Sequence, residues 1–277
     1  MARYDDDDDF DDDDRPRRKK KGRRRSGGSS GSGSSGTLWI IIGAVVFGCI
    51  LLCGGLAAIL FFPAMNEARN AARMSQSKNN LKQIGLALHN YHDTYNSFPP
   101  GSVVKDDGTV SLSWQGSILP YVDQAPLYNQ IEMGADWNGI ENMEVRSTAV
   151  PVYLNAAVPD LMAQDGLPAS HYAGNVNLFF ENKCLRIRDI VDGTSYTVIV
   201  GEVTTGLKSW GNPTNLRDPA AGLGATPNQF GLTHGPGGEG AQFLFVDGSV
   251  QFIDQNIDPE VLKALGTPSG REAIDPF

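Results

Sequence analysis

The chain has 277 residues, of which 40% are hydrophobic and 20% charged, and its formal net charge is −9 at pH 7. That length allows one sizeable core with appendages. Residues 1–25 carry nine Asp and ten Lys or Arg, so the acidic excess lies in the remainder, which gives no reason to expect a nucleic-acid partner. Of the three cysteines, Cys184 alone lies outside the first apolar run, which excludes an internal disulfide framework there.

The first 36 residues are predicted to be a disordered tail. Blocks of like charge repel one another and bury almost no surface, and Ser26–Gly36 reads as a flexible Gly/Ser linker. The basic block Arg15–Arg25 is interpreted as a topology signal that also attracts anionic lipid. The alternative is that it attracts nucleic acid.

Residues 37–62 are predicted to form a transmembrane helix, because the run contains no charged residue. The 25 residues from Leu38 to Phe62 would measure about 37 Å at ~1.5 Å per residue. A bilayer core is about 30 Å thick, so this helix would span it with some tilt. Because Lys and Arg precede it, we expect a single-pass protein of the inner (cytoplasmic) membrane with a cytoplasmic N-terminus and residues 63–277 extracytoplasmic.

Two other interpretations of this apolar run are a cleaved signal peptide and a lipoprotein anchor. A cleaved signal peptide usually has an apolar core of only about 7–15 residues, which this run exceeds. Residues 46–49 (VFGC) resemble a lipoprotein cleavage box, but the run continues beyond Cys49. Cys49 and Cys53 share one helix face, as small buried residues or, alternatively, as an acylation or dimer contact. A homo- or hetero-oligomer formed through this helix is a further expectation.

An amphipathic helix is predicted to follow Pro63. Its apolar stripe consists of residues that recur at steps of three and four: Leu81, Ile84, Leu88, Tyr91 and Tyr95. The segment Phe98–Gly101 (FPPG) ends it. The stripe needs a partner from residues 102–277.

His89, His92 and Asp93 raise the question of a metal site, since two His at i and i+3 beside a carboxylate are ligand types. Three or four converging ligands are required, and no others are identifiable. We therefore expect no metal and interpret the group as polar helix surface.

The body after Gly101 changes to strand periodicity. Residues 102–105 and 109–113 flank an Asp-Asp-Gly turn and predict a hairpin. Residues 114–124 predict a short apolar helical segment. Further strands are expected in segments rich in β-branched and aromatic residues, with a loop over 204–240: Val150–Leu154, Val176–Phe180, Leu185–Ile187 and Tyr196–Val203.

A second hairpin is predicted near the C-terminus. Gln242–Val246 and Ser249–Ile253 are joined by Asp247 and Gly248, the pair typical of a type I′ turn with two positive φ angles. The expected fold class is therefore α+β, with the long N-terminal helix packed on a mainly antiparallel β-sheet.

His234 lies at the end of the loop before this hairpin. Its imidazole is interpreted as a hydrogen-bonding group that ties down the loop. A catalytic pair of His234 with Asp247 or Glu239 is the alternative. No nucleophile elbow, zinc signature or phosphate-binding loop is recognisable, so we expect no catalytic residue, no cofactor and no enzyme activity.

Five segments in order resemble a group of uncharacterised bacterial pilin-like proteins, labelled by a C-terminal motif of His, nine residues and Asp-Gly. The resemblance runs from about Pro63 to the C-terminus, and His234, Asp247 and Gly248 match the motif. Members resemble type IV pilins and type II secretion pseudopilins, which implies a long N-terminal helix packed on a sheet and no established catalytic mechanism. The segments are residues 63–101, residues 113–131, HYAGN (171–175), DGTSYTVIVGE (192–202) and FLFVDGSVQFI (243–253).

Two departures from that family pattern bear on function. The processing signal of the family has Glu at the fifth position after the cut, where this chain has Ile41. Twelve residues separate His234 from Asp247 instead of nine. We expect that a prepilin peptidase does not process the chain.

The sequence therefore predicts a membrane-anchored, pilin-like structural or interaction protein. The alternative is a membrane-anchored module that binds or senses an envelope ligand, such as a polysaccharide, through the loop at 204–240.

Overall fold

The computed structural model describes residues 35–235 and 238–271, without the side chains of residues 35, 56–64 and 234–235. The predicted tail, residues 1–36, therefore lies almost wholly outside the described residues. The chain divides into two units, Met1–Ile59 and Leu60–Phe277, each described by itself.

Helix α1, Ser35–Tyr95, contributes to both units. In the first unit, Gly36–Gly55 has a mean hydropathy of 2.5 and is long and apolar enough to cross a membrane. Its large side chains are exposed, among them Trp39 at 72% and Leu52 at 73%. By length and hydropathy alone, a signal sequence near the N-terminus would also meet this criterion.

In the second unit, α1 supplies one wall of the hydrophobic core. Leu81, Ile84 and Leu88 are at most 1% exposed, which confirms the predicted stripe. Tyr91 is half-buried, but Tyr95 is 59% exposed, so its assignment to the stripe was wrong. Tyr95 is the last residue of the helix, and its ring packs on Tyr91 at 4.5 Å.

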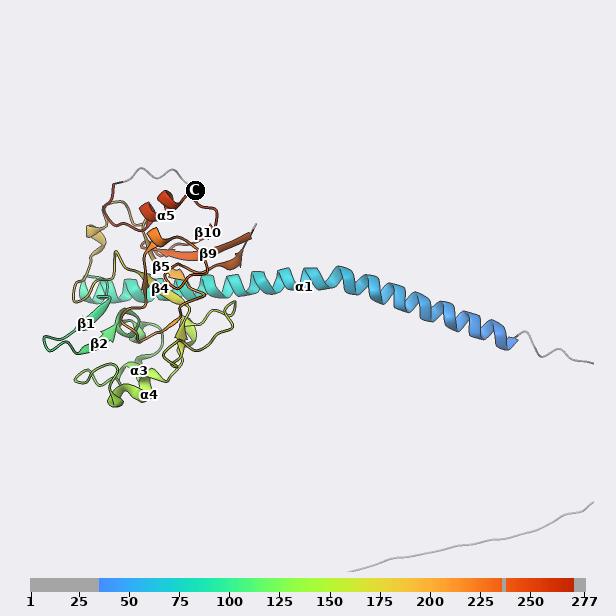
Figure 1. Ribbon diagram of the computed structural model, residues 1–277, viewed down its shortest axis with the longest axis horizontal. Coiled ribbons are helices and arrows are strands. Elements are labelled where there is room, and N and C mark those ends of the chain that lie inside the picture. The colour runs from blue at the N-terminus through green and yellow to red at the C-terminus, as the bar shows by residue number, and fades with distance from the viewer. Residues whose placement is uncertain (1–34, 236–237, 272–277) are drawn as a thin grey trace, which may run out of the picture. The chain divides into compact units, whose positions relative to one another are not determined.

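Four short α-helices, five 3₁₀ turns and ten strands make up the rest of the secondary structure in the described residues. Figure 1 shows how they surround the C-terminal half of α1. The helices are α2 (Trp114–Ser117), α3 (Ala125–Tyr128), α4 (Met143–Arg146) and α5 (Pro259–Leu265). The strands are β1 (Ser102–Val104), β2 (Val110–Ser113), β3 (Ala169–Ser170), β4 (Tyr172–Asn175), β5 (Val198–Glu202), β6 (Lys208–Ser209), β7 (Leu216–Arg217), β8 (Thr233–Gly235), β9 (Gly238–Phe245) and β10 (Val250–Asp254).

The main sheet has the order β10-β9-β5-β4-β7, and β8 pairs with β9 outside this path. Only the β4–β7 pair is parallel among these described ladders. The predicted class, α+β with a mainly antiparallel sheet, is confirmed.

The two faces of the sheet carry two separate apolar clusters. Along β9 the side chains alternate between the faces. Leu244 belongs to the cluster that contains the α1 stripe, whereas Phe243 and Phe245 belong to the cluster that contains Leu262 and Leu265 of α5. Helices α1 and α5 therefore cover opposite faces of the sheet.

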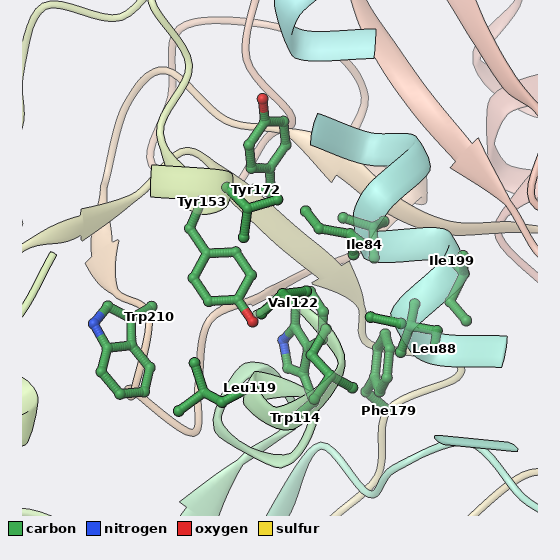
Figure 2. Packing of buried hydrophobic residues seen from close by; sticks show 14 of the residues in the cluster. Ile84, Leu88, Trp114, Leu119, Val122, Tyr153, Tyr172, Phe179, Ile199 and Trp210 are labelled. Atoms are coloured by element: carbon green, nitrogen blue, oxygen red, sulfur yellow. The ribbon is translucent and has the colours of Figure 1, made fainter. Parts of the chain in front are cut away.

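The α1-side cluster is rich in aromatic side chains (Figure 2). Trp114 stacks on Phe179 with ring centroids 4.9 Å apart. The buried Tyr153 donates from its hydroxyl to the Gln115 carbonyl at 2.8 Å, so this polar atom is satisfied inside the core. The remaining wall of this cluster comes from the predicted hairpin of β1 and β2 and from the helical turns that begin at Trp114.

Two predicted strands are instead turns. In Val150–Leu154 the chain forms a 3₁₀ turn at Pro151–Tyr153, because the ring of Pro151 suits a first helical position. In Val176–Phe180 the turn begins at Asn175, whose side chain accepts from the Asn177 amide at 3.0 Å.

The predicted strand Leu185–Ile187 is also wrong. A 3₁₀ turn, Ile187–Asp189, starts there, and the Asp189 carboxylate accepts from the Arg186 amide at 3.0 Å. Strand β4 was missed because its sequence, YAGN, includes small residues that have little strand preference.

The C-terminal hairpin is confirmed by the β9–β10 pairing, but its predicted type I′ turn is wrong. Gly248 has a φ of +84°, whereas Asp247 is not among the residues with positive φ. The Gly248 amide donates to Phe245 O at 3.0 Å and the Phe245 amide donates to Ser249 O at 2.9 Å. This pattern is a turn followed by a left-handed glycine in a bulge.

Substitution of Leu88 tests the packing of α1 on the sheet. Leu88→Ala should lower the free energy of unfolding by about 2–5 kcal/mol, because it leaves a cavity in the core. The measurement is denaturant unfolding of the full chain in detergent. Leu86→Ala, at a site 62% exposed on the same helix, is the control and should change it by less than about 0.5 kcal/mol. Equal effects of the two substitutions would contradict the assigned face.

Candidate functional site

The motif residues lie at the two ends of β9. His234 lies on β8, where the register places it opposite Glu239, while its side chain lies outside the described residues. Asp247 follows the other end of β9, eight residues beyond Glu239, or roughly 25 Å along an extended strand. The structure therefore does not bring the backbones of His234 and Asp247 together, which contradicts the alternative of a catalytic pair formed by these two residues.

Asp247 and Gly248 lie against α1. A Cβ atom added at Gly248 would meet His89 Nε2 at 3.8 Å, an ordinary contact distance. The Asp247 carboxylate accepts from the Ser249 amide at 2.8 Å. Burial raises the pKa of Asp247, but hydrogen bonds from Ser249 and Ser195 and the charge of His89 outweigh it and lower that pKa. Backbone geometry and packing against α1 therefore explain why Asp and Gly stand at this turn.

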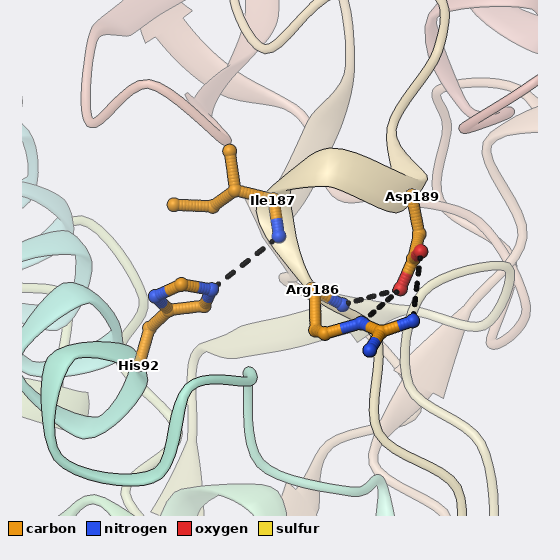
Figure 3. A network of polar contacts seen from close by, with 4 residues as sticks. All are labelled: His92, Arg186, Ile187 and Asp189. Carbon is orange, nitrogen blue, oxygen red and sulfur yellow. Dashed lines mark hydrogen bonds and ion pairs between the residues drawn. The ribbon is translucent and has the colours of Figure 1, made fainter.

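His92 has a structural partner. Its Nε2 accepts from the Ile187 amide at 3.4 Å, beside the ion pair of Arg186 with Asp189 (Figure 3). Burial lowers the pKa of His92, against the charge of Asp93, so its neutral form accepts this bond. Among the described residues no group of three His, Cys, Asp or Glu could hold a metal ion.

The most unusual polar group in the described domain is Glu202, which the sequence analysis did not single out. It ends strand β5 and is 1% exposed. Side chains two residues apart on a strand share a face, so Glu202 points to the same side as Val200, which packs in the α1 cluster.

Four donors surround the Glu202 carboxylate. Ser77 of α1 donates to Oε1, and Asn155 Nδ2 donates to Oε1 at 2.8 Å. Thr233 Oγ1 donates to Oε2 at 2.9 Å, and the Gln242 amide donates to Oε2 at 2.8 Å. Each oxygen thus accepts two bonds, an arrangement that suits the ionised carboxylate, which is acceptor-only.

The network extends along α1. Because the Ser77 proton points to Glu202, the Tyr172 hydroxyl donates to Ser77 Oγ at 2.9 Å. Asn80 Nδ2 donates to the Tyr172 hydroxyl at 3.3 Å and to Leu154 O at 2.8 Å. The Gln242 side chain donates to Met74 O at 2.8 Å. Polar bonds therefore fix α1 between Met74 and Asn80, immediately before its apolar stripe.

His171 supports this network from the next layer. Its Nδ1 accepts from the Asn155 amide at 2.7 Å, and its Nε2 donates to Asp160 O at 2.8 Å. Both bonds require the neutral imidazole protonated at Nε2. Burial lowers the pKa of His171, against hydrogen bonds with Asp160 and Asn155, which agrees with that neutral form.

Burial is also the main influence on Glu202. It raises the pKa of the carboxyl group, against the bonds from Ser77, Gln242, Thr233 and Asn155 that lower it. The described ion pairs join Arg186 to Asp189 and Lys263 to Glu260, so within the described part Glu202 has no cationic partner.

A cavity of about 220 Å³ lies beside Glu202. Asn70, Arg73 and Met74 of α1 form one wall, and strands β8 and β9 form another. Its lining residues are Asn70, Arg73, Met74, Asn155, Ala157, Glu202, Leu232, Thr233 and Glu239. Glu202, Asn155 and Thr233 are buried at its floor, whereas Arg73 and Glu239 are exposed at its rim.

The family model described as "Protein of unknown function (DUF1559)" matches residues 66–177 and 165–234, together more than half of the chain. The chain belongs to the DUF1559 family. The matched ranges contain Ser77, Asn155 and Glu202, whereas Asp247 and Gly248 lie beyond them. The DUF1559 match does not itself establish the pilin-like assignment. No curated protein and no solved structure matches the chain.

One signal for Glu202 was present in the sequence of this DUF1559 member. TVIV (197–200) is an apolar strand segment, and a carboxylate two residues later continues the face of Val200. Charged strand ends are usually solvated. Only the tertiary arrangement of Ser77, Asn155 and Thr233 reveals that this one is buried.

Replacing Glu202 by glutamine tests the four-donor arrangement. The amide NH₂ of Glu202→Gln would face two of the four donors, and unsatisfied buried donors cost about 1–3 kcal/mol. The free energy of unfolding of the full chain in detergent should fall by that amount. The exposed Glu181→Gln is the matched control and should stay within about 0.5 kcal/mol of the unsubstituted chain. A neutral effect at Glu202 would refute the arrangement.

His171 predicts a pH dependence of stability. Its folded pKa is below the ordinary value of 6.5, so the unfolded chain takes up this proton first as pH falls. The contribution of neutral His171 is present above 6.5 and should be lost as pH falls from there towards the folded pKa. Thermal midpoints measured between pH 7.5 and 5 should fall less steeply for His171→Gln, with His92 supplying part of the remaining slope. Identical slopes would contradict this prediction.

Proposed function

We propose that this DUF1559 protein is a membrane-anchored structural or interaction protein with a pilin-like architecture. Its α+β domain would be presented outside the cytoplasm from the inner membrane, and its N-terminus would remain inside. The basic tail, which lies outside the described residues, would contact anionic lipid.

The observation that carries this proposal is the exposed apolar surface of Gly36–Gly55. Side chains such as Trp39, Phe47 and Leu52 are 62–73% exposed, and no residue in the most apolar part of this segment is buried. Contiguous apolar surface of this size is unfavourable in water. A bilayer removes this apolar surface from water. The helix can enter the bilayer because its backbone N–H and C=O groups are already hydrogen-bonded to one another.

The same surface supports association in the bilayer. Helices pack in membranes through small residues, and Gly43, Gly48, Gly54 and Gly55 have no atom within 4 Å of an added Cβ. A homo- or hetero-oligomer through α1 is therefore part of the proposal. Because Ile41 replaces the family Glu, the anchor would be retained without prepilin processing, and the protein would act without catalysis.

A second candidate function is a membrane-anchored binding module. The cavity beside Glu202 favours it, since perturbed buried carboxylates in cavities are typical of functional sites. The loop at 204–240, which the sequence predicts to contact the ligand, contributes Leu232, Thr233 and Glu239 to the lining of this cavity.

Charges placed in the apolar segment test the anchor. Each Arg near the centre of a span costs about 2.5–3.5 kcal/mol, so Phe47→Arg with Ile50→Arg should release much of the protein from washed membranes. The control pair, Leu86→Arg with Tyr95→Arg, lies at positions 62% and 59% exposed on the domain and should leave the membrane fraction unchanged.

A reporter fused after Phe277 tests the orientation. If the reporter is of a kind that is active only outside the cytoplasm, it should be active. Unsubstituted protein that is soluble without detergent would reject the proposal.

A further inference from the structure

The cavity beside Glu202 has walls of opposite charge character. Arg73 and Asn70 lie on the α1 wall, and Glu239 lies on the β9 wall above the buried carboxylate of Glu202. We infer that this cavity binds a small zwitterion of amino-acid size, with its ammonium group at Thr233 and Glu239 and its carboxylate at Arg73 and Asn70. The inference rests on the second candidate function, the binding module, and is independent of membrane anchoring.

The preference for an ammonium group follows from Glu202. Buried charges in proteins are usually paired, yet within the described residues this carboxylate has no cationic partner. Its four bonds come from neutral donors, so its negative charge remains uncompensated. A cation that enters the cavity would compensate the negative charge of Glu202. The site is partly desolvated, so the attraction between the two charges is stronger there than in water.

Direct bonds to the ammonium group come from other oxygens. The acceptor positions of Glu202 are already occupied by its four donors. The Thr233 hydroxyl donates to Glu202 and so presents its lone pairs for acceptance. The Glu239 carboxylate at the rim makes no side-chain hydrogen bond or ion pair with another described residue. These two groups together offer oxygen acceptors of the kind that an ammonium group needs.

The opposite wall suits an anion. Asn70 and Arg73 are three residues apart on α1 and so share a helix face. Neither side chain makes a hydrogen bond or ion pair with any other residue in the described ranges. An Arg guanidinium with an adjacent amide is a natural receptor for a carboxylate, because the guanidinium donates two parallel N–H bonds.

Size and wall composition restrict the ligand further. The cavity of about 220 Å³ is smaller than the roughly 300–1,000 Å³ of pockets for drug-sized ligands. Among the described residues that line it, none has an aromatic ring on which a sugar or a base could stack. A compact ligand with two charged ends fits better than a polysaccharide.

A ligand in this position would bridge two elements. It would contact residues 70–74 of α1 on one side and β8 and β9 on the other. The Gln242 side chain of β9 already bonds to Met74 O within this stretch, and Ser77, about one turn further along α1, bonds to Glu202 of β5. Binding would therefore extend the contact between α1 and the sheet towards the N-terminal side of the helix.

Calorimetric titration of the full chain in detergent tests the inference. The probes are glycine, L-alanine and L-lysine, with propionate and ethylammonium as ligands that carry only one of the two charges. We expect saturable binding of at least one amino acid, at least tenfold tighter than either single-charge probe. Arg73→Gln and Glu239→Gln should each weaken it at least tenfold, whereas the distant Glu181→Gln should leave it unchanged.

Three results would overturn the inference. The first is no saturable binding of any of the three amino acids, and the second is equal affinity for a single-charge probe. The third is amino-acid binding that persists in both Arg73→Gln and Glu239→Gln. Both rim residues are exposed, so their variants should fold, which thermal unfolding of the same samples verifies. None of these results affects the membrane fraction, so a failure of anchoring is recognised separately.

Discussion

The contact between α1 and the sheet depends on a buried carboxylate. Glu202 accepts bonds from a helix residue, a loop residue, a strand side chain and a strand amide, contributed by Ser77, Asn155, Thr233 and Gln242. The apolar stripe of α1 supplies the larger hydrophobic term, but an apolar contact alone tolerates sliding. The buried carboxylate of Glu202 opposes such sliding, because displacement of α1 would leave hydrogen-bond donors and acceptors unsatisfied. We regard the network as the element that fixes the register of α1 on the sheet.

This arrangement places the chemistry where α1 changes character within the domain. From Leu81 onward its inner face is apolar and buried, whereas residues 65–73 are exposed or half-buried. Between them lie Ser77 and Asn80, which are buried and polar. The cavity opens at this transition. Among the described residues, Glu202 is the one buried carboxylate without a cationic partner, and it lies next to the helix that would present the domain.

The sequence predicted well those features that have a local cause. The spacing of Leu81, Ile84 and Leu88 forces one helix face to be buried, and the Asp-Gly pair forces a hairpin. It predicted less well where side chains compete with the backbone. Pro151 and Asn175 form turns in segments that their apolar neighbours make look like strands.

The site itself was beyond prediction from periodicity. Ser77, Asn155 and Glu202 are separated by 47 to 125 positions in the chain, and each alone resembles an ordinary surface residue. Their convergence follows from how α1, the loop after Tyr153 and β5 pack together. The sequence drew attention instead to His234 and Asp247, whose backbones the strand register separates.

A double-mutant cycle between Ser77 and Glu202 tests the central claim most directly. The free energy of unfolding of the full chain in detergent would be measured for the unsubstituted protein, Ser77→Ala, Glu202→Gln and the double variant. If the bond between them fixes α1 on the sheet, the two effects should be non-additive, with a coupling energy of about 0.5–3 kcal/mol. Additivity within about 0.3 kcal/mol would contradict the account.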